Sequence, residues 1–439
     1  MPRATLALLA VAGVVGAVAC GLFERRPDVV VIVLDTLRAD HVSAYGYARR
    51  TTPRIDALAA EGVLYRRAIA PGTWTVPSHA GLFTGRPPVE HGAYRVPDAP
   101  HAVSSLNAGV ETLAEWLGAA GYDTAAFVGN ETYLDPSFGM ARGFELYRTD
   151  DTRPGERLAN RVTRWIRRRA RRPAFLFVNF LDVHEPYRAH PPYDTRFPGK
   201  LPEDPGDVTA RFAATGELPA PAVLTHCISQ YDGDVAYVDA QLARILDELA
   251  KHGRYDNALI VVTSDHGDLF GEHGRLGHGG IPWDALVHVP LVIRYPRGAH
   301  RGVEDRVVSL VDVAPTVLAV LGLPPLAGAP GRPLWAPSRP VVAEEMNPDG
   351  TIERALYDDA GTRVVLEHAA KGGRRLALYD LAADPGQEQP VEPGDAEPDR
   401  HLVAALDAYE RGAAAVVRGP VVVPNGKQLD RLRALGYVQ

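Results

Sequence analysis

The sequence predicts an α/β protein whose mostly parallel central sheet is covered by helices on both faces. Several short apolar runs, rich in β-branched residues, are continuous rather than alternating, which is typical of strands buried on both faces. These runs occupy residues 28–34, 123–128, 175–181, 258–263 and 289–293. Segments with apolar residues at helical spacing lie between them, and strands that alternate with helices favour a parallel sheet.

Two helices are expected with the clearest boundaries. Residues 112–120 form a helical pattern that ends at Gly121, a residue type that often terminates helices. A longer pattern runs from Tyr231 to Leu249 and is followed by Gly253. Residues 187–222 are instead rich in Pro and Gly with little periodicity, so we expect a long loop that covers the functional face as a substrate lid.

The chain divides into three expected units. The first is a targeting segment at residues 1–20, and the second is a large domain at residues 27–335. A Pro-rich break at 323–340 leads into the third unit, a C-terminal subdomain at residues 336–439. In that subdomain we expect a small antiparallel sheet and a terminal helix, with strands near 341–344, 363–367 and 375–379.

Composition excludes several classes of protein. The net charge of −7 argues against general nucleic-acid binding. With only two cysteines, Cys20 and Cys227, the chain has neither a disulfide framework nor a Cys-rich zinc site. An apolar content of 46% is ordinary for a globular protein with a large core.

The N-terminus has the features of an export signal. Arg3 precedes an apolar run at residues 4–19, which is too short for a confident membrane span. Residues 17–21, Ala-Val-Ala-Cys-Gly, resemble a bacterial lipobox in which Cys20 is lipidated and becomes the first mature residue. We therefore expect an exported protein of the periplasm or cell envelope, anchored through Cys20. Simple cleavage and an uncleaved anchor remain alternatives.

A basic segment at residues 153–172 contains nine arginines around apolar residues at helical spacing. It predicts an amphipathic helix, and two interpretations are open. The helix could contact an anionic membrane surface beside a lipid anchor. Alternatively, it packs on the domain and its arginines form an ordinary solvated face.

Polar side chains that follow two of the predicted strands suggest a metal site. Asp35 directly follows the strand at 28–34, and Asp265-His266 follow the strand at 258–263. Ligands bind beyond the carboxyl ends of strands in open α/β sheets, so these groups are expected to meet. Together with the Thr75 hydroxyl they form a mixed oxygen and nitrogen set suited to a divalent ion such as Mn or Zn.

Thr75 is the expected nucleophile. It lies just ahead of Pro77 and a short helix-like run, and the start of a helix favours an anion through its free N–H groups and dipole. A hydroxyl held there is placed to attack a phosphoryl or sulfuryl centre. His184 and His278 lie in polar segments where an imidazole could hold a substrate oxygen or protonate the leaving oxygen. We expect structural roles for His91 and His273.

Further motifs recur along residues 28–439 in a characteristic order. They occupy residues 35–41, 52–59, 73–86, 184–187, 231–239, 264–268, 271–274, 311–318, 378–385 and 432–437. In content and order they resemble the sulfatase family of the alkaline phosphatase superfamily. The resemblance implies an α/β/α sandwich around a mostly parallel mixed sheet, with catalysis in residues 27–335 and a smaller α+β C-terminal subdomain.

The resemblance also implies roles for single residues. Asp35, Asp265 and His266 would hold one divalent ion together with Thr75, the nucleophile. His184 would bind the transferred group. His278 stands where many sulfatases have a Lys that contacts the ester oxygens, and His79 replaces the Arg of the nucleophile signature; both are expected to face substrate. Thr36 replaces a second acidic ligand, which favours Mn or Zn over Ca.

Thr75 departs from the family pattern in a way that bears on the reaction. Sulfatases oxidise Cys or Ser at this position to formylglycine, and the extra methyl on Cβ of Thr prevents an aldehyde from forming. The expected activity is therefore metal-dependent hydrolysis of phosphate mono- or diesters, or of sulfate esters, with Thr75 as a covalent nucleophile activated by the metal. The substrate is expected to be a small molecule, glycan or lipid ester.

Three alternatives remain open from the sequence. The protein could transfer a phosphoryl group to an envelope lipid or glycan, or it could be a noncatalytic binding protein with the same fold. A second metal ion could bind at Asp182, His184 and His278, although one ion is the simpler expectation.

Overall fold

The central strand of the main sheet is apolar along its whole length because both of its faces are covered. The computed structural model describes residues 25–99, 101–149, 154–169, 172–413, 418–424, 426 and 428–429. Strand β1 (Asp28–Leu34) is buried at every position. Its residues alternate between two core clusters: Val29, Val31 and Val33 face one, and Val30, Ile32 and Leu34 face the other.

The main sheet has eight strands, in the order β11-β2-β10-β7-β1-β6-β4-β5. They are β11 (Gly302–Ser309), β2 (Val63–Ile69), β10 (His288–Arg294), β7 (Ala258–Thr263), β1, β6 (Ala174–Phe180), β4 (Asp123–Val128) and β5 (Leu146–Thr149). Strand β10 runs antiparallel to β7 and β2, and the other pairs are parallel. The predicted mostly parallel sheet is confirmed, although β2, β5 and β11 were missed.

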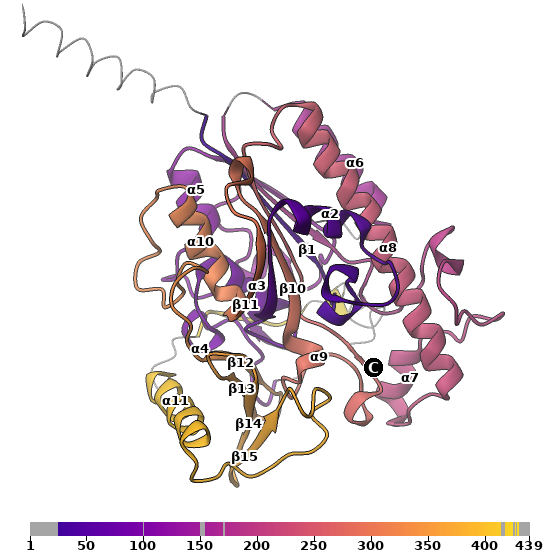
Figure 1. Cartoon of the computed structure of the whole chain (residues 1–439), viewed down its shortest axis with the longest axis vertical. Coiled ribbons are helices and arrows are strands. Elements are labelled where there is room, and N and C mark those ends of the chain that lie inside the picture. The colour runs from indigo at the N-terminus through magenta and orange to yellow at the C-terminus, as the bar shows by residue number, and fades with distance from the viewer. Residues whose placement is uncertain are drawn as a thin grey trace, which may run out of the picture.

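Helices cover both faces of this sheet (Figure 1). One face carries α2 (Pro53–Glu61), α6 (Gly155–Arg167) and α8 (Pro221–Lys251), and the other carries α3 (Thr75–Thr84), α5 (Leu113–Ala119) and α10 (Val313–Val320). Short helices α4 (Pro88–His91) and α9 (Asp284–Val287) lie in the connections. The two predicted helices correspond to α5 and α8, and α8 begins ten residues earlier than expected.

The predicted loop at residues 187–222 has more regular structure than its composition indicated. It contains a short 3₁₀ turn (Tyr193–Thr195) and helix α7 (Val208–Thr215). The Asp207 side chain accepts a hydrogen bond from the Ala210 N–H and so caps α7. Pro221 occupies the first position of α8, where a proline is well tolerated.

A second, antiparallel sheet follows in the C-terminal part of the chain. It consists of β12 (Val341–Met346), β13 (Ile352–Tyr357), β14 (Arg363–Ala370) and β15 (Gly373–Asp380). Helix α11 (Glu397–Ala413) lies beside this sheet (Figure 1). Its Leu402 and Leu406 are buried in one apolar cluster with side chains of β13, β14 and β15. The expected small sheet is present, and β13 is the strand that was missed. Residues 430–439, where the chain ends, lie outside the described residues. Two small ribbons pair β3 (Val103–Ser104) with β16 (Val421–Val422), and β8 (Leu269–Phe270) with β9 (Leu276–Gly277).

The basic segment forms helix α6, and its apolar side chains face the protein. Leu158, Val162 and Ile166 are buried in the core cluster that α6 shares with α8. The apolar face of α6 therefore packs on the domain, and its arginines form an outer face. This arrangement agrees with the interpretation of the segment as a packed helix with a solvated basic face. Residues 1–24, including Cys20, lie outside the described residues. Within the described part of the chain, no helix is both long and apolar enough to cross a bilayer.

We expect Ile32→Ala to destabilise the protein by about 2–5 kcal/mol, because Ile32 is fully buried in the central strand and its truncation leaves a cavity. Urea unfolding would measure this change in free energy. Leu218→Ala is the matched control: Leu218 is 42% exposed, so its truncation should change stability by less than about 0.5 kcal/mol. Equal effects of the two substitutions would contradict the buried position of β1.

Candidate active site

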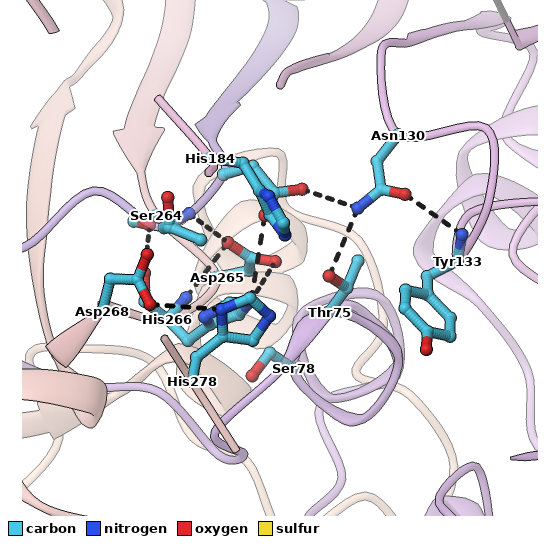
Figure 2. Close-up of polar contacts among 12 residues, drawn as sticks. Thr75, Ser78, Asn130, Tyr133, His184, Ser264, Asp265, His266, Asp268 and His278 are labelled. Carbon is cyan, nitrogen blue, oxygen red and sulfur yellow. Dashed lines mark hydrogen bonds and ion pairs between the residues drawn. The ribbon is translucent and has the colours of Figure 1, made fainter. Parts of the chain in front are cut away.

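Polar side chains from four elements converge at the carboxyl edge of the main sheet (Figure 2). Asp35 directly follows β1, and Asp265 and His266 follow β7. His184 comes shortly after β6, and Thr75 is the first residue of α3. The parallel strands carry these residues to one edge, as the sequence indicated.

The side chains of Asp35, Asp265 and His266 form a compact, fully buried group. One ligand atom from each lies within 4.8 Å of the others. The His266 Nε2 atom is 3.8 Å from Asp35 Oδ1 and 3.4 Å from Asp265 Oδ2. These three atoms have no hydrogen-bond partner among the described residues. Buried polar atoms normally have one, so their arrangement fits a bound divalent cation.

The neighbouring contacts orient these ligand atoms. His266 Nδ1 donates to the Gly267 carbonyl at 2.9 Å, which leaves the lone pair of Nε2 for a cation. Asp265 Oδ1 accepts the N–H groups of Thr36 and His266 at 3.3 and 3.1 Å. Thr36 has a φ of 60°, which is rare for a β-branched residue, and this conformation directs its N–H to Asp265.

The environment of the two carboxyl groups disfavours their charge. Burial raises the pKa of Asp35 to about 7, and the neighbouring Asp265 carboxylate adds to the shift. Burial likewise raises the pKa of Asp265 to about 7. Burial lowers the pKa of His266, so this imidazole stays neutral and able to coordinate. A cation would offset the cost of two buried carboxylates at neutral pH.

Asn130 connects the nucleophile to this group, and the sequence analysis did not identify it. Its Nδ2 donates to Asp35 Oδ2 at 3.0 Å. The same nitrogen approaches Thr75 Oγ1 at 3.3 Å (Figure 2). Its own position is fixed by Tyr133 N–H and by Asn179. Asn179 also donates to Asp35 Oδ2, at 3.3 Å. Asn130 comes two residues after the end of β4. This position at a strand end is the sequence feature that could have marked it as a site residue.

His79 lies one turn after Thr75 and is fully buried. Its Nδ1 donates to the Thr75 carbonyl at 2.9 Å and lies 3.5 Å from Asp265 Oδ2. Burial lowers its pKa to about 3, so the imidazole is neutral at pH 7. These contacts join the first turn of α3 to the acidic group, while the role of His79 as a substrate contact stays a prediction.

The rings of His184 and His278 have centroids 4.9 Å apart, and the His278 ring centroid is 4.5 Å from that of His266. The Nδ1 of His184 donates to the Glu185 carbonyl at 2.8 Å, and that of His278 is 3.3 Å from Asp268 Oδ1. These contacts orient both imidazole rings through their Nδ1 atoms. Burial opposes the charge of Asp268, but its contacts with His278 and Tyr187 lower its pKa overall.

The predicted alternative set for a second ion has a different composition in the structure. Asp182 accepts the Gly155 N–H at 2.8 Å and does not join His184 and His278. Glu185 takes its place: one ligand atom each from His184, Glu185 and His278 lie within 4.8 Å of one another. Neither group includes His91 or His273. His91 bonds the Pro77 carbonyl, and the His273 ring stacks on Trp283 with ring centroids 3.8 Å apart.

The C-terminal sheet also reaches the edge of the site. Glu345 on β12 accepts hydrogen bonds from Thr73 Oγ1 at 2.9 Å and from Arg95 Nε at 3.1 Å. The Arg95 guanidinium lies 4.4 Å from the ring centroid of Trp74, the residue that precedes Thr75. Thr73 and Trp74, the two residues before the start of α3, are therefore held by side chains from outside the main sheet. No local sequence pattern pointed to Arg95 or Glu345.

We expect the affinity for Mn²⁺ or Zn²⁺ to fall as the pH drops from 8 to 6. The cation needs ionised Asp35 and Asp265, and with pKa values of about 7 both carboxyls are mostly protonated at pH 6. Binding then releases protons, so the affinity should weaken by about ten-fold or more per pH unit. Isothermal titration calorimetry on metal-stripped protein would measure this.

Asp35→Asn and Asp265→Asn should each weaken cation binding at pH 8 by more than about ten-fold. Asp305→Asn is the control. Asp305 is 78% exposed and lies on β11, which is four strands away from β1 in the sheet. Equal affinities for all of these variants would show that the cation binds elsewhere.

Comparison with known proteins agrees with this geometry. A family model described as Sulfatase matches residues 27–323. The N-sulphoglucosamine sulphohydrolase of Homo sapiens is 28% identical over 327 residues, which cover 69% of this chain and 62% of that protein. The "Uncharacterized sulfatase YidJ" of Escherichia coli (strain K12) is 25% identical over 359 residues, which cover 72% of each chain.

Solved structures confirm the expected fold. The crystal structure of the phosphonate monoester hydrolase of Agrobacterium radiobacter matches with a TM-score of 0.70 and 24% sequence identity. The match covers 91% of this chain and 100% of that one. Both the predicted family and the predicted class of ester hydrolase are therefore confirmed. The chain belongs to the sulfatase family.

Proposed function

We propose that this chain hydrolyses phosphate mono- or diesters with Thr75 as its covalent nucleophile and one divalent cation as cofactor. The observation that carries the proposal is the arrangement around Thr75 Oγ1. It lies at the start of α3, in contact with an amide that also binds Asp35. Beside it are three buried ligand atoms that have no hydrogen-bond partner in the described part of the chain. An alcohol next to a cation site is the arrangement that transfer of a tetrahedral oxyanion requires.

Two residues favour phosphoryl over sulfuryl chemistry. The Cβ methyl of Thr75 prevents oxidation of this side chain to the aldehyde on which the family's sulfatases depend. His79, which takes the place of the signature Arg, is neutral at pH 7 and bonded to the Thr75 carbonyl. It therefore cannot supply the positive charge of that Arg. Sulfate ester hydrolysis remains the second candidate because of family membership and the activity named for the human relative.

Asp35, Asp265 and His266 would hold the cation, together with Thr75. When bound, a divalent cation lowers the pKa of a neighbouring hydroxyl and stabilises negative charge on the transferred group. A mixed set of carboxylate, imidazole and hydroxyl ligands suits Mn or Zn better than Ca.

The side chains of the site then have separate tasks in two steps. In the first step, Thr75 loses its proton to solvent, the bond between Oγ1 and phosphorus forms, and the bond to the leaving oxygen breaks. His278 or His184 takes up a proton from solvent and gives it to that oxygen. In the second step, water attacks phosphorus, and the Thr75 oxygen leaves and regains a proton. A monoester substrate then releases phosphate, and a diester releases a phosphate monoester. Asn130 orients the hydroxyl throughout, through the 3.3 Å contact.

The acceptor in the second step decides whether the protein is a hydrolase or a transferase. Water makes the protein a hydrolase, whereas the hydroxyl of a lipid or glycan would make it a transferase. The N-terminal sequence supports export to the periplasm or cell envelope, with a lipid on Cys20. The nucleophile and ligand residues, all present, argue against a purely noncatalytic role.

We expect Thr75→Ala to lower the turnover of a nitrophenyl phosphodiester by at least about 10⁴-fold while leaving cation affinity within a few fold, because the other ligands remain. Thr75→Ser should retain measurable turnover. Thr84→Ala, at the buried last position of the same helix, is the control for folding and should retain most of the activity. Nitrophenyl sulfate, assayed on the same preparations, distinguishes the two candidate functions.

A phosphorylated Thr75 peptide should be recovered when turnover is quenched in acid and the digest is examined by mass spectrometry. Its signal should be absent in Thr75→Ala and should decay when an alcohol acceptor is added, if transfer competes with hydrolysis. Full phosphodiesterase activity in Thr75→Ala would contradict the covalent mechanism. Faster turnover of the sulfate ester than of the phosphodiester would favour the second candidate.

A further inference from the structure

A basic surface cavity lies at the opposite edge of the main sheet from the active site. It has a volume of about 1010 Å³. It is bordered by the starts of β2 and β11 at Val63 and Gly302 and by Pro27, which precedes β1. Tyr295, at the end of the antiparallel strand β10, also lines it. The active-site residues follow the other ends of these parallel strands. Because β1 has seven residues, the two edges are roughly 20 Å apart.

Positive charge dominates the lining of this cavity. Arg25, Arg26, Arg297 and Arg301 all border it and are exposed. The lining also contains Glu304, whose carboxylate is paired with Arg306 at 2.6 Å. Asp28 pairs with Arg254, which lies outside the lining, at 2.8 Å and with Arg25 at 3.2 Å, so one carboxylate is shared by two arginines. The cavity therefore attracts anions.

Exposed apolar side chains lie beside these arginines. Trp335 is 51% exposed and Val303 is 55% exposed, and both line the cavity. A large aromatic side chain among arginines is typical of proteins that bind the headgroup region of a bilayer, where the ring enters the interface and the guanidinium groups meet phosphates.

The N-terminal sequence leads directly to this cavity. Arg25 and Arg26 are among the first described residues, and they follow the apolar run at 4–19 and Cys20. If Cys20 carries a lipid, the five residue steps from Cys20 to Arg25 can span at most about 18 Å. A lipid anchor would then hold the cavity within that distance of the membrane surface.

We propose that this cavity is the docking surface for the anionic phospholipids of the membrane in which the N-terminus is anchored. Charge complementarity and the short sequence separation between Cys20 and Arg25 both support a bilayer as the occupant. Helix α6 is less suitable, because its apolar residues Leu158, Val162 and Ile166 are buried in the core. Docking by this edge turns the active site away from the bilayer, so the substrate arrives from the aqueous side. This inference stands independently of the reaction proposed above.

The test uses the full chain and vesicles of two compositions, phosphatidylcholine alone and phosphatidylcholine with one quarter phosphatidylglycerol, in a sedimentation assay at low salt. The apolar leader contributes equally to both, so the difference between the two compositions measures docking. We expect Arg297→Gln/Arg301→Gln to weaken binding to the anionic vesicles by about 25-fold, at roughly five-fold per arginine, and to leave binding to neutral vesicles unchanged. High salt should abolish the difference for the unmodified protein.

Arg157→Gln/Arg164→Gln on α6 is the matched control, since it removes the same charge from another exposed face. It should retain most of the preference for anionic vesicles. The proposal is overturned if the α6 pair loses as much binding as the cavity pair, or if the cavity pair binds like the unmodified protein. Brominated phosphatidylglycerol gives a second measurement: it should quench tryptophan fluorescence in the unmodified protein and much less in Trp335→Phe. Equal quenching in both would also overturn the proposal.

Discussion

The active site depends on two carboxyl groups, Asp35 and Asp265, that the parallel strands place together inside the protein at one edge of the sheet. Among the described residues, their partners are amides, backbone N–H groups and histidines, none of which carries a full positive charge at pH 7. Burial therefore raises the pKa of both to about 7. Such an arrangement costs stability unless a cation occupies it, and a cost of this kind is typical of a functional site.

The surrounding structure holds this edge rigid and brings the reacting groups to it. Asn130 and Asn179 fix one oxygen of Asp35, so that the other oxygen stays directed at His266. Helix α3 starts at Thr75, and Glu345 of the C-terminal sheet holds the residue two positions before it. The small sheet thus contributes to the site as well as to stability. The site is built on strand ends and a helix start, which position side chains more tightly than loops do.

The sequence predicted the parts of the site that local pattern marks. Asp35 and Asp265 follow continuous apolar runs, and Thr75 precedes Pro77 at a helix start. Asn130 also follows a strand, but an amide there is common in turns and carried no comparable signal. Arg95 and Glu345 meet across 250 positions of sequence, which no local pattern reveals. Strands β2, β5 and β11 were missed because they are only partly buried and lack the continuous apolar runs of the central strands.

Crystals of the protein grown with Mn²⁺ would show where the cation binds, through an anomalous difference map recorded at a wavelength where manganese scatters strongly. We expect a peak in coordination contact with Asp35 Oδ1, Asp265 Oδ2 and His266 Nε2, with the Thr75 hydroxyl beside it. A map with no peak among these atoms, or with its only peak among His184, Glu185 and His278, would contradict this expectation.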